Sequence, residues 1–204
     1  MAKIKLTKNE LKKQKDSLKM YSRYLPTLIL KKQQLQAEIR TTEIRLRELR
    51  EKKEHIDQSF KTWIAVFGEK GIFTPDILKV TEVKTEHGNV AGVAIPVFKG
   101  AEFEITSYDL ARMPLWLDLA VDRLKQLALL DLEAQIVEEQ RRRLDHELRI
   151  TTQRVNLFEK IKIPEARDNI KKIQIFLGDQ QTAAVVRGKI AKRGLARVSQ
   201  GSGA

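Results

Sequence analysis

Two apolar seams, one in each half of this chain, constrain its fold more than any other sequence feature. The first seam is formed by Leu11, Gln14, Leu18, Tyr21, Leu25, Leu28, Lys32, Leu35, Ile39, Thr42, Leu46, Leu49, Lys53, Ile56, Phe60 and Trp63. The second is formed by Trp116, Ala120, Arg123, Leu127, Leu130, Ala134, Val137, Arg141, Leu144, Leu148, Thr151, Val155 and Phe158. A seven-residue repeat kept over this length predicts helices that wind around a partner. The simplest partner of each half is the other half, which predicts an antiparallel pair.

The segment between the seams has a different character. Gly68, Gly71 and Pro75 interrupt the helical pattern. Valine-rich and isoleucine-rich runs then flank the tetrapeptide at residues 86–89 (Glu-His-Gly-Asn), a pattern typical of a β-hairpin. Pro96 should place its strand at an edge. A lone hairpin is marginally stable in water, so we expect this one to pack on helical turns or on a partner.

These patterns predict a mainly α fold, a long two-helix antiparallel coiled coil with a small β-hairpin and short-helix insertion in the middle. We expect the termini at one end of the coil and the hairpin at the other. The expected divisions are residues 1–64 for the first helix, 65–113 for the insertion, 114–195 for the second helix and 196–204 for a flexible tail.

The helix ends and interruptions also have sequence signals. Thr7 and Glu10 have the spacing of a capping box, which predicts the start of the first helix. This helix should continue to about residue 63 and be kinked at Pro26. The second helix should start near residue 109 or 114 and continue to about residue 193. Pro164 is its one expected interruption.

Positive charge is concentrated at the two ends of the sequence. The chain has a formal net charge of +12. Residues 1–32 contribute +8 and residues 187–204 contribute +5, which leaves −1 for the remainder. An antiparallel pair brings both basic segments to one end, where they could meet an acidic partner. The alternative is that they only aid solubility and complement a helix dipole.

Residue patterns of known chemistry are missing from the sequence. The three histidines are far apart, and Ile150 stands where a zincin motif starting at His146-Glu147 would need its second histidine. No glycine-rich phosphate loop is present, and there is no cysteine. The paired carboxylates Glu138 and Glu139 lie among arginines. We therefore expect no catalytic, cofactor-binding or metal-binding residue, and a chain that is not an enzyme on its own.

Arg141, Arg142 and Arg143 have two interpretations. They could form a contact patch for a partner or a nucleic acid, or they could pair with carboxylates on their own helix. Ion pairing, with Glu138, Glu139, Asp145 and Glu147 as partners, is the favoured interpretation for Arg142 and Arg143. No apolar run approaches the ~20 residues that span a bilayer, and the N-terminal residues lack a signal-peptide pattern. We expect a cytoplasmic protein.

One segment of the second helix resembles a known family. Residues 149–164 have the sequence RITTQRVNLFEKIKIP. This resembles the segment that marks the D subunit of the V-type and A-type rotary ATPases. The matching positions are Arg154, Val155, Asn156, Phe158, Glu159, Ile163 and Pro164. The resemblance extends to the first helix, through Leu6-Thr7-Lys8, Leu11, Lys13, Leu28, Lys31 and Leu35.

The resemblance implies the rotor, or axle, of a central stalk. Such a rotor stands inside a hexamer of A and B subunits and couples ATP hydrolysis or synthesis to rotation of a membrane ring and to proton or sodium transport. Its other partners would be the F subunit and the subunit that links the stalk to the ring. It would be peripheral to the membrane, contact it only through the complex, and bind neither a cofactor nor nucleic acid. The alternative function is a coiled-coil adaptor or an RNA-binding arm.

Two groups of residues are the candidate contact sites. The seven signature positions form the first group. The second consists of seam residues, namely Leu28, Leu35, Leu46, Leu49, Leu144 and Leu148.

Overall fold

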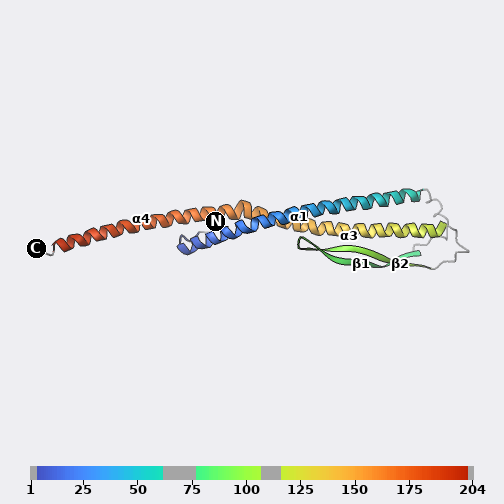
Figure 1. Ribbon diagram of the computed structural model, residues 1–204, viewed down its shortest axis with the longest axis horizontal. Helices are drawn as coiled ribbons and strands as arrows, with labels where there is room; N and C mark the ends of the chain where they lie inside the picture. Colours follow the sequence, from blue (N-terminus) through green and yellow to red (C-terminus); the bar gives the residue numbers. More distant parts are fainter. Residues whose placement is uncertain (1–3, 62–76, 107–115, 202–204) are drawn as a thin grey trace. The chain divides into compact units, whose positions relative to one another are not determined.

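The computed structural model describes residues 4–61, 77–106 and 116–201. The elements follow the order α1 (Lys8–Lys61), β1 (Leu78–Val90), β2 (Val93–Ile105), α3 (Trp116–Leu157), the π-helical turn η2 (Phe158–Lys162) and α4 (Ile163–Gly201) (Figure 1). The fold is mainly helical, with a small two-stranded antiparallel hairpin in the middle, as predicted. The expected boundaries near residues 64 and 113 lie outside the described residues, as do the expected end of the first helix and start of the second.

The chain divides into two compact units. The terminal unit comprises Met1–Leu30 and Thr152–Ala204, and the central unit comprises Lys31–Thr151. Both α1 and α3 contribute residues to each unit.

Helix α1 begins where the cap predicted it. The Thr7 hydroxyl accepts a hydrogen bond from the Glu10 N–H (3.3 Å), and the Leu11 N–H donates to the Thr7 carbonyl (3.0 Å). The helix continues through Pro26 as one element. Every seam position from Leu11 to Ile56 is buried or half-buried. The first predicted seam is therefore confirmed over its described length.

In the central unit, α1 and α3 run antiparallel. Leu46 and Leu49 form a buried cluster with Val137, and Leu130 and Ala134 pack against it. Three ion pairs join the helices: Lys31–Glu147 (2.7 Å), Arg45–Glu133 (2.6 Å) and Lys53–Asp131 (2.6 Å). As residue numbers rise along α1, those of the partners fall along α3, which fixes the antiparallel direction. The predicted contact of Leu46 and Leu49 with the region 130–144 is confirmed.

The second seam is also confirmed, with one correction. Among its described positions, only Arg123 is exposed. Its guanidinium donates to the Gln126 side chain (3.3 Å) and stays in solvent because burial would leave its charge without a carboxylate.

The hairpin turn lies three residues after the predicted one. Residues 86–89 belong to β1, and Ala91 and Gly92 form a two-residue turn between Val90 and Val93. Both turn residues have positive φ (50° and 79°), as a type I′ turn requires, and the Asn89 side chain accepts the Gly92 N–H (3.0 Å). Placing the turn at residues 86–89 was wrong because Gly88 is needed for close packing within the strand. A Cβ at Gly88 would lie 2.9 Å from Val97 Cγ2.

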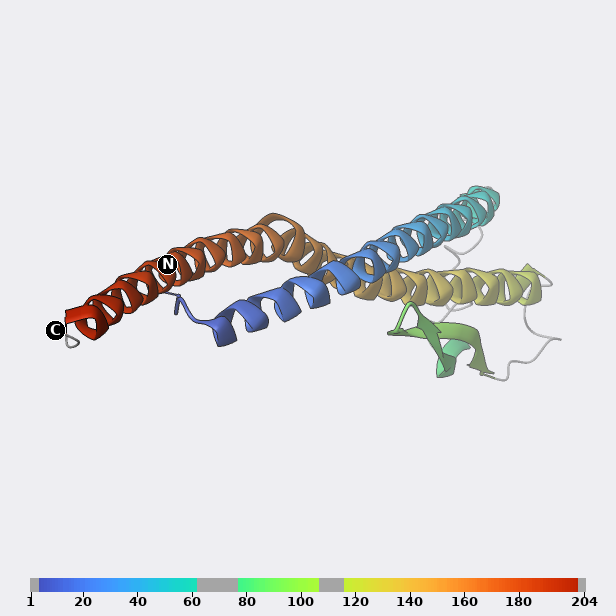
Figure 2. The ribbon, with the colours of Figure 1, turned by 60° about the vertical axis from the view of Figure 1, so that its left-hand side comes forward.

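The hairpin lies along α3 instead of projecting from one end of the helix pair (Figures 1 and 2). At its base, Ile77 packs against Leu117 and Val121 near the start of α3. At its tip, Ile95 joins a buried cluster with Leu35, Ile39 and Leu144, against which Val90, Ala91, Val93 and Leu148 pack. The prediction that the hairpin lies at the far end of the helix pair is therefore corrected. The hairpin lies along the helices because the apolar side chains at its tip pack against α1 and α3.

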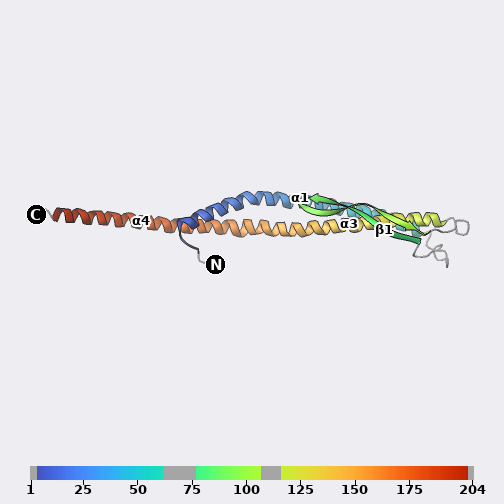
Figure 3. The ribbon, with the colours of Figure 1, turned by 90° about the horizontal axis from the view of Figure 1, so that it is seen from below.

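The terminal unit contains the rest of both seams. Tyr21 and Phe158 bring their rings to 5.1 Å between centroids, at an interplanar angle of 43°. Val155, Ile163, Ala166 and Ile173 are buried, whereas every side chain described from Gly178 to Arg193 is exposed. Helix α4 accordingly extends beyond the first turn of α1 (Figure 3).

Cysteines at Leu46 and Val137 should be joined within one chain by a short bifunctional maleimide, because both side chains belong to one buried cluster. The chain has no native cysteine, so the product is unambiguous on a denaturing gel. Ile44→Cys with Val137→Cys is the matched control, since Ile44 points outward and is 56% exposed. Linkage found only between two chains would contradict the intramolecular pair.

Candidate partner-binding surfaces

The seven signature positions all lie in the terminal unit, around the π-helical turn. Val155 and Ile163 are buried and Phe158 is half-buried against Tyr21, so these three stabilise the helix pair. The remaining four, Arg154, Asn156, Glu159 and Pro164, are exposed.

The exposed polar signature residues are available to a partner. Within the described part of the chain, Arg154, Asn156 and Glu159 form no hydrogen bond or ion pair with another side chain. A polar residue on the outside of a coiled coil is not required by helix packing. A contact with another molecule would explain why these residue types stand here.

The six seam residues proposed as contact sites lie inside the helix pairs. Leu35 and Leu144 are 0% and 1% exposed and share one cluster, with Leu148 packed beside them. Leu46 and Leu49 share a second cluster, and Leu28 is half-buried in the terminal unit. Their side chains support the surface from within and do not form it.

A row of uncharged residues on the outside of α1 in the central unit was not among the sites predicted from the sequence. Gln34, Ala37, Thr41 and Ile44 follow one another at spacings of three or four, and all are exposed. Outer positions of a two-stranded coil are normally charged. The signal was present in the sequence, because these are the positions of the repeat farthest from the seam.

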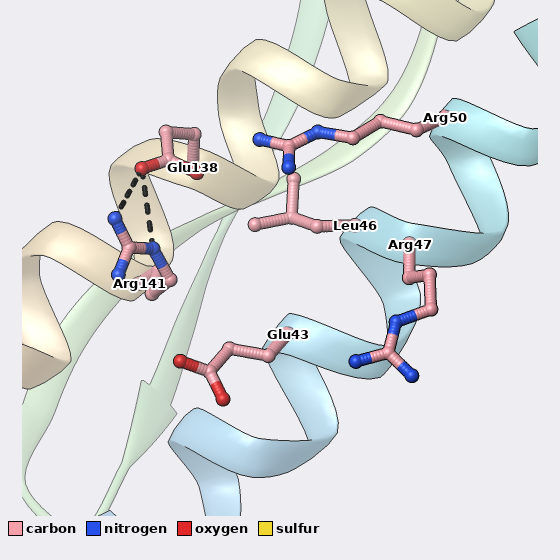
Figure 4. A pocket seen from close by; sticks show the side chains of 6 residues that line it. All are labelled: Glu43, Leu46, Arg47, Arg50, Glu138 and Arg141. Carbon is pink, nitrogen blue, oxygen red and sulfur yellow. Dashed lines mark hydrogen bonds and ion pairs between the residues drawn. The ribbon is translucent and has the colours of Figure 1, made fainter.

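A groove between α1 and α3 adds a second feature to the central unit. It has a volume of about 510 Å³ and is lined by Glu43, Leu46, Arg47, Arg50, Glu138 and Arg141 (Figure 4). Arg141 donates to Glu138 (2.6 Å) on the surface of α3. In the described residues neither Arg47 nor Arg50 lies within ion-pair distance of a carboxylate, although the charge of Arg50 helps to lower the pKa of Glu138. These two guanidinium groups can accept a carboxylate from another molecule.

The net positive charge of the chain lies entirely in the terminal unit. It contains nineteen Lys/Arg and six Asp/Glu, a net charge of +13, while the central unit has −1. The exposed part of α4 combines Arg187, Lys189 and Lys192 with the apolar Val186 and Ile190. A basic, partly apolar stretch of exposed helix suits a surface that is both acidic and apolar.

Comparison with known proteins identifies the family. The family model for the ATP synthase D subunit matches residues 10–193. The V-type ATP synthase D subunit of Borreliella burgdorferi is 52% identical over 204 residues, which are 99% of this chain and 100% of that protein. The chain belongs to the ATP synthase D-subunit family. Relatives with the same name in Chlamydia trachomatis and Chlamydia abortus are 35% and 33% identical, covering 93% of this chain and 95% and 92% of their own lengths.

Other features of this family member concern chemistry and the membrane. Within the described ranges, no group of three or more histidine and acidic side chains is placed to hold a metal ion. The helices described are too polar or too short in their apolar stretches to cross a bilayer.

The three consecutive arginines pair with carboxylates on their own helix. Arg142 and Arg143 both donate to Glu139 (2.7 and 2.8 Å), and Arg141 pairs with Glu138 and Asp145. This confirms the favoured interpretation, except that Glu147 binds Lys31 of α1 instead. The hydrogen bonds from Arg142 and Arg143 lower the pKa of Glu139 from 4.5 to about 2. Arg141 likewise lowers the pKa of Glu138, and Lys53 lowers that of Asp131.

Acid should weaken the central unit, because these carboxylates bind protons more weakly in the folded chain than in the unfolded one. Their stabilisation is fully present above the unfolded values of 3.8 to 4.5 and is lost as the pH falls through their lowered pKa values, which for Glu139 is about 2. Thermal unfolding followed by circular dichroism should show the melting temperature falling over this range. Glu139→Gln should flatten the fall, whereas Glu54→Gln, at an exposed site without a described ion pair, should not. An equal effect of both substitutions would contradict the assignment.

Proposed function

We propose that this member of the D-subunit family is the rotor of a V/A-type ATPase or ATP synthase. It would couple ATP hydrolysis or synthesis in a hexamer of A and B subunits to rotation of a membrane ring and to proton or sodium transport. The F subunit and the subunit that links the stalk to the ring would be its further partners. The chain would be a non-catalytic, cytoplasmic component, peripheral to the membrane.

One observation carries this proposal beyond family membership. The central unit is a pair of long antiparallel helices with continuous seams, cross-linked by three ion pairs and braced by a hairpin. Such an element resists bending and separation of its helices, as a torque shaft must. It also presents unlike surfaces on its different sides, so that one orientation could favour one of three equivalent hexamer sites through differential contact.

The charge of the terminal unit supports a further part of the proposal. We place the basic end of this unit in the upper bore of the hexamer. Its positive charges repel one another in the free protein, and surrounding acidic groups would offset that repulsion. The small side chains of Ala183, Ala184 and Gly188 reduce the diameter of the exposed part of α4, which would let the surrounding subunits approach it closely. Torque would depend instead on the seam-packed shaft.

The same charge also favours the alternative function, an RNA-binding arm or adaptor. Purification of the tagged chain under native conditions from its own organism separates the two. Recovery of A, B and F subunits with ATPase activity is expected for the rotor. Recovery of RNA without them, with affinity falling steeply as salt rises, would replace the rotor by the alternative.

Replacing Leu144 and Leu148 together by alanine should impair ATP-driven rotation more than deleting residues 187–204. Truncation of the buried Leu144 should cost roughly 2–5 kcal/mol of packing, and truncation of the half-buried Leu148 beside it adds a smaller loss. The deletion removes charge and exposed residues and should reduce assembly or coupling only in part. Rotation of a bead attached to the reconstituted complex measures both effects.

Leu119→Ala with Leu157→Ala is the matched control for the shaft variant, because the same atoms are removed from exposed positions. This control should rotate normally. If the deletion abolishes rotation while the Leu144/Leu148 variant turns like the original, torque does not depend on the shaft as proposed.

A further inference from the structure

The seam of the second helix shifts by one residue within the terminal unit. Up to Val155 the buried side follows the predicted repeat. The next buried residue is Ile163, which is eight positions on, where the repeat requires seven. Beyond it the apolar positions Ala166, Ile170, Ile173 and Leu177 are buried or half-buried and resume the repeat, displaced by one. The buried Asn169, beside Ile170, is the polar exception at the undisplaced position. The helix therefore contains one extra residue.

The π-helical turn η2 absorbs this extra residue. The Ile163 N–H donates to the Phe158 carbonyl, five residues back, in place of the four of an α-helix. Pro164 follows and has no N–H to donate. Next to the displaced bond of Ile163, the helix therefore lacks one backbone hydrogen bond entirely. Because the extra residue is taken up in a π turn, the apolar face of the helix points toward the partner helix both before and after the turn.

The opposite helix is interrupted at nearly the same level. The ring contact between Tyr21 and Phe158 places the start of η2 beside residue 21 of α1. Pro26 lies five residues farther along, roughly one and a half helical turns away. Pro26 lacks the N–H that would bond to the Ser22 carbonyl. Both helices of the terminal unit thus lose backbone hydrogen bonds within a short length.

The central unit has the opposite construction. Its hairpin contacts α3 from Leu117 to Leu144, a helical length of roughly 40 Å at 1.5 Å per residue. Strands of 13 residues have about the same length at 3.3 Å per residue. Between base and tip, Lys125 lies over the Phe103 ring and Gln140 donates to the Pro96 carbonyl. The hairpin therefore braces the helix pair over this whole distance.

We infer that the helix pair bends preferentially at a flexure formed by residues 21–26 of α1 and 158–164 of η2 and α4. Sharp helix bends occur at prolines and π turns, where the backbone ladder is incomplete. Here Pro26 of α1 lies within about two helical turns of the level of the π turn in the second helix. The braced central unit resists the same deformation. In the proposed rotor the flexure would be the part of the shaft that yields first under torque. The role of the flexure under torque rests on the proposed function, whereas the preferential bending at this place does not.

Two changes remove the flexure without altering the seam. Deleting the exposed Lys160 leaves Val155 and Ile163 seven residues apart, so that η2 can become a regular helix. Pro26→Ala restores the missing donor in α1. The matched controls are Lys160→Ala, which keeps the extra residue, and Arg23→Ala, which changes an exposed residue of the same stretch of α1 and leaves its backbone donors unchanged. Helix content measured by circular dichroism confirms that each variant folds.

Hydrogen exchange on the isolated full-length chain provides the first readout. Amides of residues 22–30 and 158–167 should exchange about ten-fold faster than those around Leu46 and Val137, because local opening there breaks fewer bonds. The variant with both changes should slow this exchange, and the two controls should not. If the variant with the deletion fails to fold, the original protein and Pro26→Ala still decide the question.

Distances between spin labels provide the second readout. Labels at Ile44 and Ile175, both exposed, span the flexure, and labels at Ile44 and Leu119 lie within the central unit. We expect a broad distance distribution for the first pair, narrowed by Lys160 deletion with Pro26→Ala, and a narrow one for the second pair throughout. Equal widths for the two pairs in the original protein, or a width across the flexure that the combined change leaves unaltered, would overturn the inference.

Discussion

Continuity of the apolar seam is the constraint on which the rest of this structure depends. A two-helix pair can bury only the residues that face the partner helix, about two in every seven. In α1 each of these positions from Leu11 to Ile56 is at least half-buried, although Lys32, Thr42 and Lys53 are polar. The Thr42 hydroxyl donates a hydrogen bond to the Glu38 carbonyl, and Lys53 forms an ion pair with Asp131 of α3. Polar residues are thus accommodated in the seam by local bonds, and they fix the register between the helices instead of breaking it.

Features set by neighbouring residues could be predicted from the sequence, whereas those set by distant contacts could not. The cap at Thr7 and the two seams follow from local spacing. The hairpin turn could not be located because Gly88 and Gly92 are equally plausible turn residues in the sequence. Only the packing of Gly88 against Val97 and the burial of Ile95 between the helices decide between them. The same holds for Glu147, whose choice of Lys31 over an arginine on its own helix depends on the register between α1 and α3.

The candidate contact surfaces show a similar division. The signature at residues 154–164 could be recognised in the sequence, and the predicted seam already includes Val155 and Phe158. The burial of Ile163 required the structure, because a strict seven-residue count from Val155 reaches Lys162 and misses the extra residue in η2. The uncharged row on α1 was overlooked for another reason. A search for apolar periodicity finds the buried side of a helix first, and this row lies on the opposite side.

Asymmetry connects this architecture to the proposed rotor. A bare pair of similar helices would present nearly the same surface after half a rotation about its axis. In the central unit the hairpin covers one side of α3, the uncharged row marks the outside of α1, and Arg47 and Arg50 line the groove between the helices. A neighbour placed at successive positions around such a shaft would meet different chemistry at each, and only such a difference can change the relative populations of its conformations. The hairpin would therefore contribute twice, by bracing the helices and by making their sides unequal.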